Sequence, residues 1–156
     1  MKKQTIIMLA NAGIQSITNH SLDTAQAYKV VKFRKAFNAA LDAIAEDQKA
    51  LLKESGIGED TQSFNKEMDE LRKANRTPEQ EAKLKEMEAQ LKRYNEMNGE
   101  LLKEEVTLDC KTMPYEAWHT LQNENKAVGE PKRDLLSGFV EDVLEGVLWV
   151  APEDKD

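Results

Sequence analysis

The chain has 156 residues, a net charge of −7 and one cysteine, and these numbers exclude several classes of protein. A lone cysteine cannot build an intrachain disulfide framework, so the composition indicates a reducing compartment. The acidic balance disfavours nonspecific binding to nucleic acid because phosphate groups are repelled. The length suits a single domain, residues 1–156, and a 33% share of charged residues suits long helices with narrow buried faces.

Residues 1–20 are expected to form an N-terminal strand and turn segment. Residues 5–9 are β-branched and apolar, which is typical of a short strand, and Gly13 interrupts the following stretch, where a turn or a short helix is expected. Lys2 and Lys3 precede the apolar run as in a signal peptide. The run stops at Asn11, however, and is shorter than the roughly 7–15 residues that export requires. We therefore expect no export, and no apolar stretch is long enough to span a membrane.

Residues 23–103 predict a helical hairpin region. In the first helix, 23–54, apolar residues recur every seven positions from Val30 to Leu51. A second helix is expected at 62–75, and a third at 78–103, because Thr77 can cap its start, Pro78 suits its first position and Gln80 can complete a capping box. The two long helices are expected to pack antiparallel in a coiled-coil-like manner. This packing would bury Val30, Phe37, Ile44, Leu84, Met87 and Leu91.

Residues 106–150 predict a strand followed by a helical segment. Apolar and polar residues alternate from 106 to 111, as in a half-buried strand. A short helix is expected after Pro114, a longer one at 134–145 and a last strand at 147–150, before an acidic tail at 151–156. The expected fold class is mainly α with a small β element (α+β): a long antiparallel helical hairpin with short strands before and after it.

A pattern of residue types across most of the chain carries a resemblance. The residues concerned are Asn11, Ile14 and Ile17, then 27–29, 94–95, 101–108 and 144–149. In these residues the chain resembles a family of small proteins encoded by tailed phages and prophages, whose function is not established. The segment 67–92 of this chain is longer than the corresponding segment in the usual pattern of that family. The resemblance implies a phage or prophage origin, in the cytoplasm of a bacterial host or on the virion, and transfers no active site.

Catalytic and metal-binding chemistry finds little support in the residue types. His20 and His119 have no second ligand at helical spacing, and a zinc or iron site needs several converging ligands. Cys110 is in phase with Val106 and Leu108, which favours a buried and unreactive thiol. We expect no catalytic residue, no metal, no cofactor and no enzymatic activity. An exposed Cys110 beside His119 would reopen the question.

The residues considered for an interaction surface are cationic or aromatic. Lys29, Lys32, Arg34 and Lys35 gather near the start of the first long helix, where cations are unfavourable against the helix dipole. Pairing with acids of the third helix, or simple exposure to water, explains this cluster without a function, and Arg34 is expected partly buried against a carboxylate. Tryptophan is enriched at protein interfaces, so Trp118 and Trp149 are also candidates for contact with a partner. A large aromatic residue is, however, more often part of the core than of an interface.

Two functions from different classes follow. The first is a non-enzymatic protein acting through protein–protein contacts, as an accessory or structural component of phage assembly. The alternative is a nucleic-acid-associated protein that uses the basic start of the first long helix. A homo-oligomer, most simply a dimer, is expected because the apolar stripe of that helix is wider than the third helix can cover. The second helix, with Phe64, Met68 and Leu71, is the other candidate to cover it.

Overall fold

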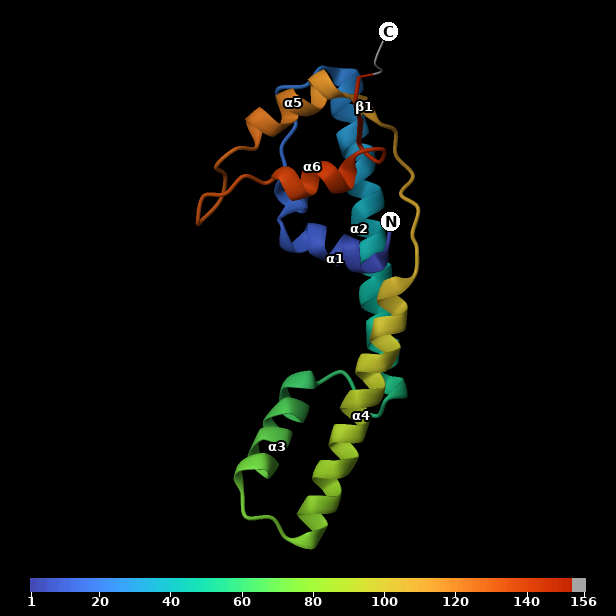
Figure 1. Ribbon diagram of the computed structural model, residues 1–156, viewed down its shortest axis with the longest axis vertical. Helices are drawn as coiled ribbons and strands as arrows, with labels where there is room; N and C mark the ends of the chain where they lie inside the picture. Colours follow the sequence, from blue (N-terminus) through green and yellow to red (C-terminus); the bar gives the residue numbers. More distant parts are fainter. Residues whose placement is uncertain (153–156) are drawn as a thin grey trace. The chain divides into compact units, whose positions relative to one another are not determined.

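The computed structural model describes residues 1–152, so the last four residues of the predicted acidic tail lie outside the described part. The described chain is 65% helical, with six helices and a two-stranded parallel sheet, which confirms a mainly α fold with a small β element. Figure 1 shows the elements in chain order. They are α1 (Lys3–Asn11), the 3₁₀ turn η1 (Ile14–Ser16), α2 (Thr24–Glu54), α3 (Thr61–Lys73), α4 (Pro78–Lys103), β1 (Met113–Pro114), α5 (Tyr115–Glu124), α6 (Gly138–Leu144) and β2 (Trp149–Val150).

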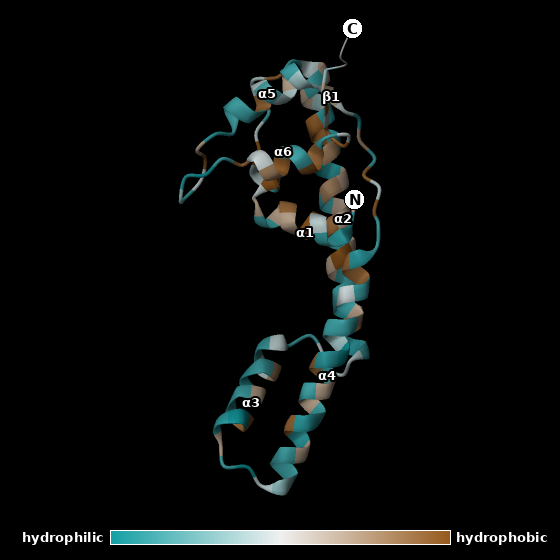
Figure 2. Ribbon diagram, in the orientation of Figure 1, coloured by the Kyte–Doolittle hydropathy of each residue, from teal (hydrophilic) through white to brown (hydrophobic). Residues whose placement is uncertain are grey.

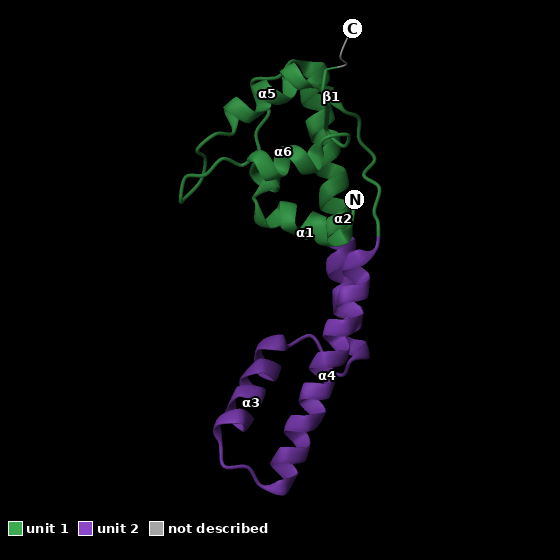
Figure 3. Cartoon of the chain, viewed as in Figure 1, with its two compact units in different colours: residues 1–41, 105–156 green, residues 42–104 purple. Residues whose placement is uncertain are grey.

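The sequence suggests one domain, and within the structure the chain divides into two compact units (Figure 3). Unit 1 combines residues 1–41 with the chain from residue 105 onward, and unit 2 consists of residues 42–104. Helix α2 contributes its first part to unit 1 and its last part to unit 2.

The predicted strand at residues 5–9 is wrong, because this segment lies within helix α1. The buried residues of α1 are Ile6 and Leu9, which are three positions apart and therefore share a helical face. Burial of this face in unit 1 outweighs the β preference of Thr5 and the two isoleucines. The expected turn or short helix is present as η1, and Gly13 allows it by adopting a φ of 88°.

The small sheet lies entirely after the hairpin region, so no strand precedes that region in the described chain. Strand β1 pairs in parallel with β2, placing Met113 opposite Trp149. Residues 106–111 keep the predicted alternation of partly buried and exposed side chains but form no strand. The predicted helix at 134–145 is shorter than expected, because α6 begins only at Gly138.

The core of unit 1 gathers buried apolar residues from every one of its helices and from both strands. The largest fully buried side chains include Trp118, Phe33 and Phe37. The two phenylalanines lie four positions apart on α2 with ring centroids 5.8 Å apart. This part of the predicted apolar stripe of α2 therefore serves the core of unit 1.

Unit 2 is a helical hairpin with a small core. The predicted capping box is present at the start of α4, where Thr77 and Gln80 satisfy each other's backbone N–H groups. Nε2 of Gln48 donates a hydrogen bond to Oδ1 of Asn98 at 3.0 Å. Nη2 of Arg93 pairs with Oε1 of Glu54 at 3.7 Å. Residue numbers rise along α2 as they fall along α4, so these helices run antiparallel, as predicted.

The burial predicted for the two long helices is largely confirmed, but the neighbours differ. Val30, Phe37, Ile44, Leu84 and Met87 are buried, and Leu91 is partly buried. Leu84 and Met87 pack against Phe64 and Met68 of α3. The prediction that α2 and α4 share one continuous apolar interface is therefore wrong, because α3 covers the first half of α4. Figure 2 shows α3 and α4 as mostly hydrophilic ribbons with few apolar positions.

Candidate interaction surfaces

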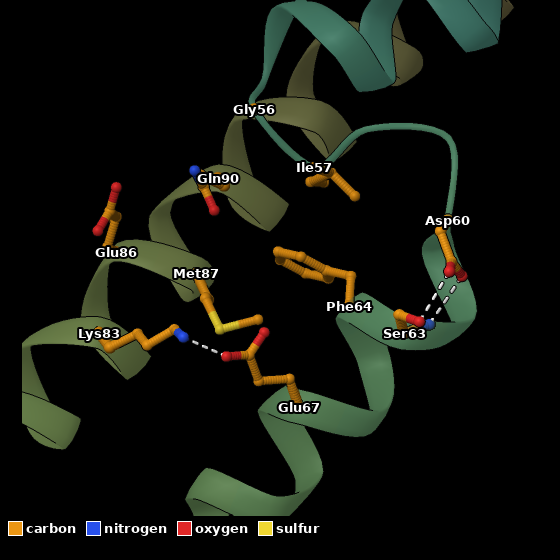
Figure 4. Close-up of a pocket in the computed structure, with 10 residues that line it drawn as sticks. All are labelled: Gly56, Ile57, Asp60, Ser63, Phe64, Glu67, Lys83, Glu86, Met87 and Gln90. Atoms are coloured by element: carbon orange, nitrogen blue, oxygen red, sulfur yellow. Dashed lines mark hydrogen bonds and ion pairs between the residues drawn. The ribbon is translucent and has the colours of Figure 1, made fainter.

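A groove of about 410 Å³ lies between α3 and α4 (Figure 4). Its apolar part consists of Ile57, Phe64 and Met87. Gly56 adopts a φ of 86°, and a Cβ atom there would come within 2.7 Å of Nε2 of Gln90. Glycine is needed at this turn for its conformation, whereas the flexible end of the Gln90 side chain could move away from a Cβ atom.

The edges of the α3–α4 groove carry charges of both signs. Glu67 and Lys83 form an ion pair across it, and Arg72 lies 3.6 Å from Glu88 further along the hairpin. Asp60 accepts hydrogen bonds from the backbone N–H (2.9 Å) and hydroxyl of Ser63, and these lower the pKa of its carboxyl. The three hydrogen-bonded or paired carboxylates act structurally, as a helix cap and as links between helices.

A second groove, of about 590 Å³, lies between α2 and α4 within unit 2. The α2 residues that line it are 47, 50 and 51, the α4 residues are 97, 100 and 101, and Glu104 follows directly after the end of α4. Both sets follow the spacing of one helical face. Ala50, Leu51, Met97 and Leu101 make up its apolar floor, and every charged residue that lines it is acidic: Asp47, Glu100 and Glu104. It combines an apolar floor with an anionic edge.

The predicted basic cluster does not form one exposed patch. Lys29, Lys32 and Arg34 are partly buried, and only Lys35 is exposed. Arg34 donates through Nη2 to the backbone carbonyl of Ile17, where a carboxylate partner was expected. Its Nε is buried without a hydrogen-bond partner among residues 1–152. Arg34 thus holds the segment before α2.

Trp118 and Trp149 are core residues of unit 1, so neither offers an exposed contact for a partner. Their rings stack with centroids 5.9 Å apart, and both are buried. Nε1 of Trp118 donates to the Glu141 carboxylate (3.1 Å), and Nε1 of Trp149 donates to the Glu141 backbone carbonyl (2.8 Å). The ring of Tyr115 lies tilted against that of Trp149, with centroids 5.4 Å apart, and stacks on the ring of His119 at the surface, with centroids 6.1 Å apart. The indoles therefore have both the apolar contacts and the polar partners that buried tryptophan requires.

The end of α5 binds the loop before α2, an arrangement that the sequence analysis did not anticipate. The buried Asn125 side chain accepts from the Thr18 backbone N–H and donates to the Thr18 carbonyl, both at 2.9 Å. The neighbouring Glu124 carboxylate accepts from the Thr18 hydroxyl and from the backbone N–H groups of His20 and Ser21. These partners are more than 100 residues apart, and no periodicity marks such a contact.

Glu124 predicts a dependence of stability on pH. Burial raises the pKa of its carboxyl, but hydrogen bonds from Ser21, Thr18 and His20 outweigh this and lower it from 4.5 to about 2. A depressed folded-state pKa stabilises the fold above pH 4.5, and this contribution is lost as the pH falls towards 2. Glu124→Gln should therefore unfold at lower denaturant than the wild type at pH 7, with the difference shrinking progressively between pH 4.5 and 2. Urea unfolding followed by tryptophan fluorescence measures this, and a constant difference across the range would contradict it.

Cys110 is partly buried, and its Sγ donates to the Val147 carbonyl at 3.3 Å. Burial and the Asp109 carboxylate raise the pKa of the thiol, against an opposite effect of Lys32. His119 is exposed and stacks on Tyr115, so the structure gives no support for a Cys110–His119 pair.

Reaction of Cys110 with a disulfide reagent is expected to be slow in the native protein and fast in denaturant. Only the thiolate attacks; the raised pKa reduces its fraction at pH 8, and the partial burial of the side chain limits access of the reagent. Absorbance of the released aromatic thiolate gives the rate. Equal rates in native and denaturing buffer would contradict this placement of the side chain.

Other sites for chemistry are sparse in the described part of the chain. Residues 1–152 hold no group of three or more His, Cys, Asp or Glu side chains that could bind a metal ion. No described helix has both the length and the apolar character needed to cross a membrane. The chain matches no protein-family model, no curated protein and no solved structure. The grooves of unit 2, which include the two described above and one lined by residues between 72 and 96, are the features that we interpret below.

Proposed function

We propose that this protein acts without catalysis, through protein–protein contacts made by unit 2, as an accessory or structural component of phage type. The resemblance to small phage-encoded proteins supports the phage setting, and the single cysteine supports the bacterial cytoplasm as the place of action. Contact with a second copy, as in a dimer, belongs to the same proposal.

The observation that carries the proposal is the amount of partly covered apolar surface in unit 2. Residues 42–104 bury only five apolar side chains: Ile44, Phe64, Met68, Leu84 and Met87. Other apolar residues along α2 and α4, including Leu51, Met97 and Leu101, are only partly buried and line a groove. Apolar surface that a chain leaves in grooves is where partner proteins commonly dock.

Site-specific crosslinking in cells tests the proposal. A photoreactive amino acid is placed at Ala50 and at Glu86, which are exposed and line the two grooves, with Thr107 of unit 1 as the control. We expect an adduct of discrete mass from at least one position in unit 2 and none from Thr107. The purified chain is also analysed by sedimentation equilibrium, where self-association would give a mass above 17.7 kDa. A monomer at all concentrations, together with no adduct from either groove, would contradict the proposal.

Nucleic-acid binding by the start of α2 has weaker support. It requires exposed, contiguous cations, whereas Lys29 and Lys32 are partly buried and Arg34 is bound to Ile17. We therefore expect no shift of duplex or single-stranded DNA or of RNA at low salt and micromolar protein, where electrostatic binding is strongest. A salt-sensitive shift that Lys35→Glu abolishes, while Lys85→Glu on α4 does not, would instead favour the nucleic-acid function.

A further inference from the structure

We propose that Asn98 is a site of spontaneous chemical modification, at which the side chain loses ammonia and becomes aspartate or isoaspartate. The chain holds nine asparagines, and Asn98 is the one that is followed by glycine, Gly99. Both residues lie in α4 within unit 2, in the last two turns before the helix ends at Lys103. The reaction belongs to this chain alone and does not depend on a partner.

The chemistry needs only the Asn98 side chain, the next backbone nitrogen and water. The backbone nitrogen of Gly99 gives its proton to hydroxide and forms a bond with Cγ of Asn98. The Cγ–Nδ2 bond breaks, and ammonia leaves with a proton taken from water. Water then opens the resulting five-membered imide at either carbonyl, which gives aspartate or an isoaspartate whose main chain passes through Cγ. Glycine favours the attack because it has no Cβ atom to crowd its nitrogen.

The native helix holds this reaction back. The imide ring fixes ψ of residue 98 far from the helical value of about −42°, so the ring does not close within a regular helix. Helical geometry also directs the Gly99 N–H along the axis to a carbonyl of the preceding turn. Nε2 of Gln48 donates to Oδ1 of Asn98 at 3.0 Å and so ties the side chain to α2. The reaction therefore proceeds through states in which the end of α4 is open.

Gly99 weakens the helix at the place where the reaction occurs. Apart from its chain neighbours and the surrounding helix backbone, no atom of residues 1–152 lies within 4 Å of a Cβ placed there. Packing therefore does not require glycine, and glycine in a helix is less favourable than alanine. The end of a helix also opens more readily than its middle. The residue that favours the attack thus also favours the opening that the attack needs.

The products change the contact between α2 and α4. Isoaspartate adds a carbon atom to the main chain, so the regular hydrogen bonds of the last turns of α4 cannot all form. Aspartate keeps an oxygen that accepts from Gln48 but adds a negative charge. We expect the isoaspartyl form to lose helix at the end of α4 and its bond to Gln48.

Mass spectrometry of the full-length protein tests the proposal. The protein is incubated at mildly alkaline pH in native buffer and in guanidinium chloride, and trypsin then releases the peptide 94–103. This peptide also contains Asn95, which is exposed and is followed by Glu96, so it carries its own control. In denaturant Asn98 should react at least about tenfold faster than Asn95. In native buffer Asn98 should react about tenfold to a thousandfold more slowly than in denaturant.

Three variants separate the chemistry from the opening of the helix. Gly99→Ala should abolish the rapid reaction in both buffers. Gln48→Ala should speed the native reaction by about twofold to tenfold, because it removes one hydrogen bond, and should leave the rate in denaturant unchanged. Lys49→Ala, at the neighbouring exposed position, should leave both rates within about a factor of two.

Each measurement has a result that would overturn the proposal. Reaction of Asn98 no faster than that of Asn95 in denaturant would remove the special role of Gly99. Equal rates in the two buffers, or no native product within the stated range, would refute control by the opening of α4. Equal effects of Gln48→Ala and Lys49→Ala would show that the bond from Gln48 does not restrain the site.

Discussion

Replacing Trp118 by alanine is expected to lower the free energy of unfolding by about 3–5 kcal/mol. The side chain is fully buried, stacks on Trp149 and donates a hydrogen bond to the Glu141 carboxylate. Truncation therefore removes a large apolar contact, leaves a cavity and deprives the Glu141 carboxylate of a donor. Urea unfolding followed by fluorescence of the remaining Trp149 measures the loss within unit 1.

The neighbouring residue provides a matched control for Trp118. His119 is exposed on the same helix and only stacks at the surface on Tyr115. His119→Ala should change the free energy of unfolding by no more than about 0.5 kcal/mol. A loss below about 1 kcal/mol for Trp118→Ala, or equal losses for the two variants, would refute the central position of this indole in the core.

Asn125→Leu is expected to cost about 2–4 kcal/mol, although it replaces a polar side chain by an apolar one of similar size. Asn125 is 1% exposed, and its amide satisfies the backbone N–H and the carbonyl of Thr18 and the carbonyl of Leu121. Leucine leaves the N–H and the carbonyl of Thr18 without these partners at a partly buried position, and each unsatisfied group costs about 1–3 kcal/mol. The Leu121 carbonyl keeps its hydrogen bond from the Asn125 backbone N–H.

The exposed Asn123, two residues earlier, supplies the control, because Asn123→Leu should be nearly neutral. Hydrogen exchange at the Thr18 amide adds a local measurement. Its protection should fall in Asn125→Leu and stay unchanged in Asn123→Leu. If Asn125→Leu left both the free energy of unfolding and the protection of the Thr18 amide unchanged, the hydrogen bonds of Asn125 to this loop would contribute nothing to stability.

Local signals in the sequence predict much of the helical structure, and contacts between distant segments account for the errors. The start of α4 follows from Thr77, Pro78 and Gln80, because a capping box depends only on neighbouring residues. By contrast, residues 5–9 have the composition of a strand, and tertiary burial of Ile6 and Leu9 makes them helical.

The candidate surfaces follow the same division. The sequence indicates that Trp118 and Trp149 are core residues more often than interface residues, and both are buried. The cluster of cations at the start of α2 is visible in the sequence, but the turning of Arg34 towards Ile17 is not. Periodicity predicts an apolar stripe on α2 and on α4, yet only the structure assigns Leu84 and Met87 to α3 and leaves Leu101 in a groove.

The discontinuity of unit 1 has a consequence for the order of folding during synthesis. Unit 2 is one uninterrupted stretch, residues 42–104, with short connections, so its contacts are local and form quickly. Unit 1 needs residues 1–41 together with the chain from 105 onward, and Thr18 reaches its partner only when Asn125 has left the ribosome. We expect the hairpin to fold first on the nascent chain. The N-terminal apolar residues, Ile6 and Leu9 among them, then remain uncovered until the last third of the protein is made, which is the interval when aggregation is most dangerous.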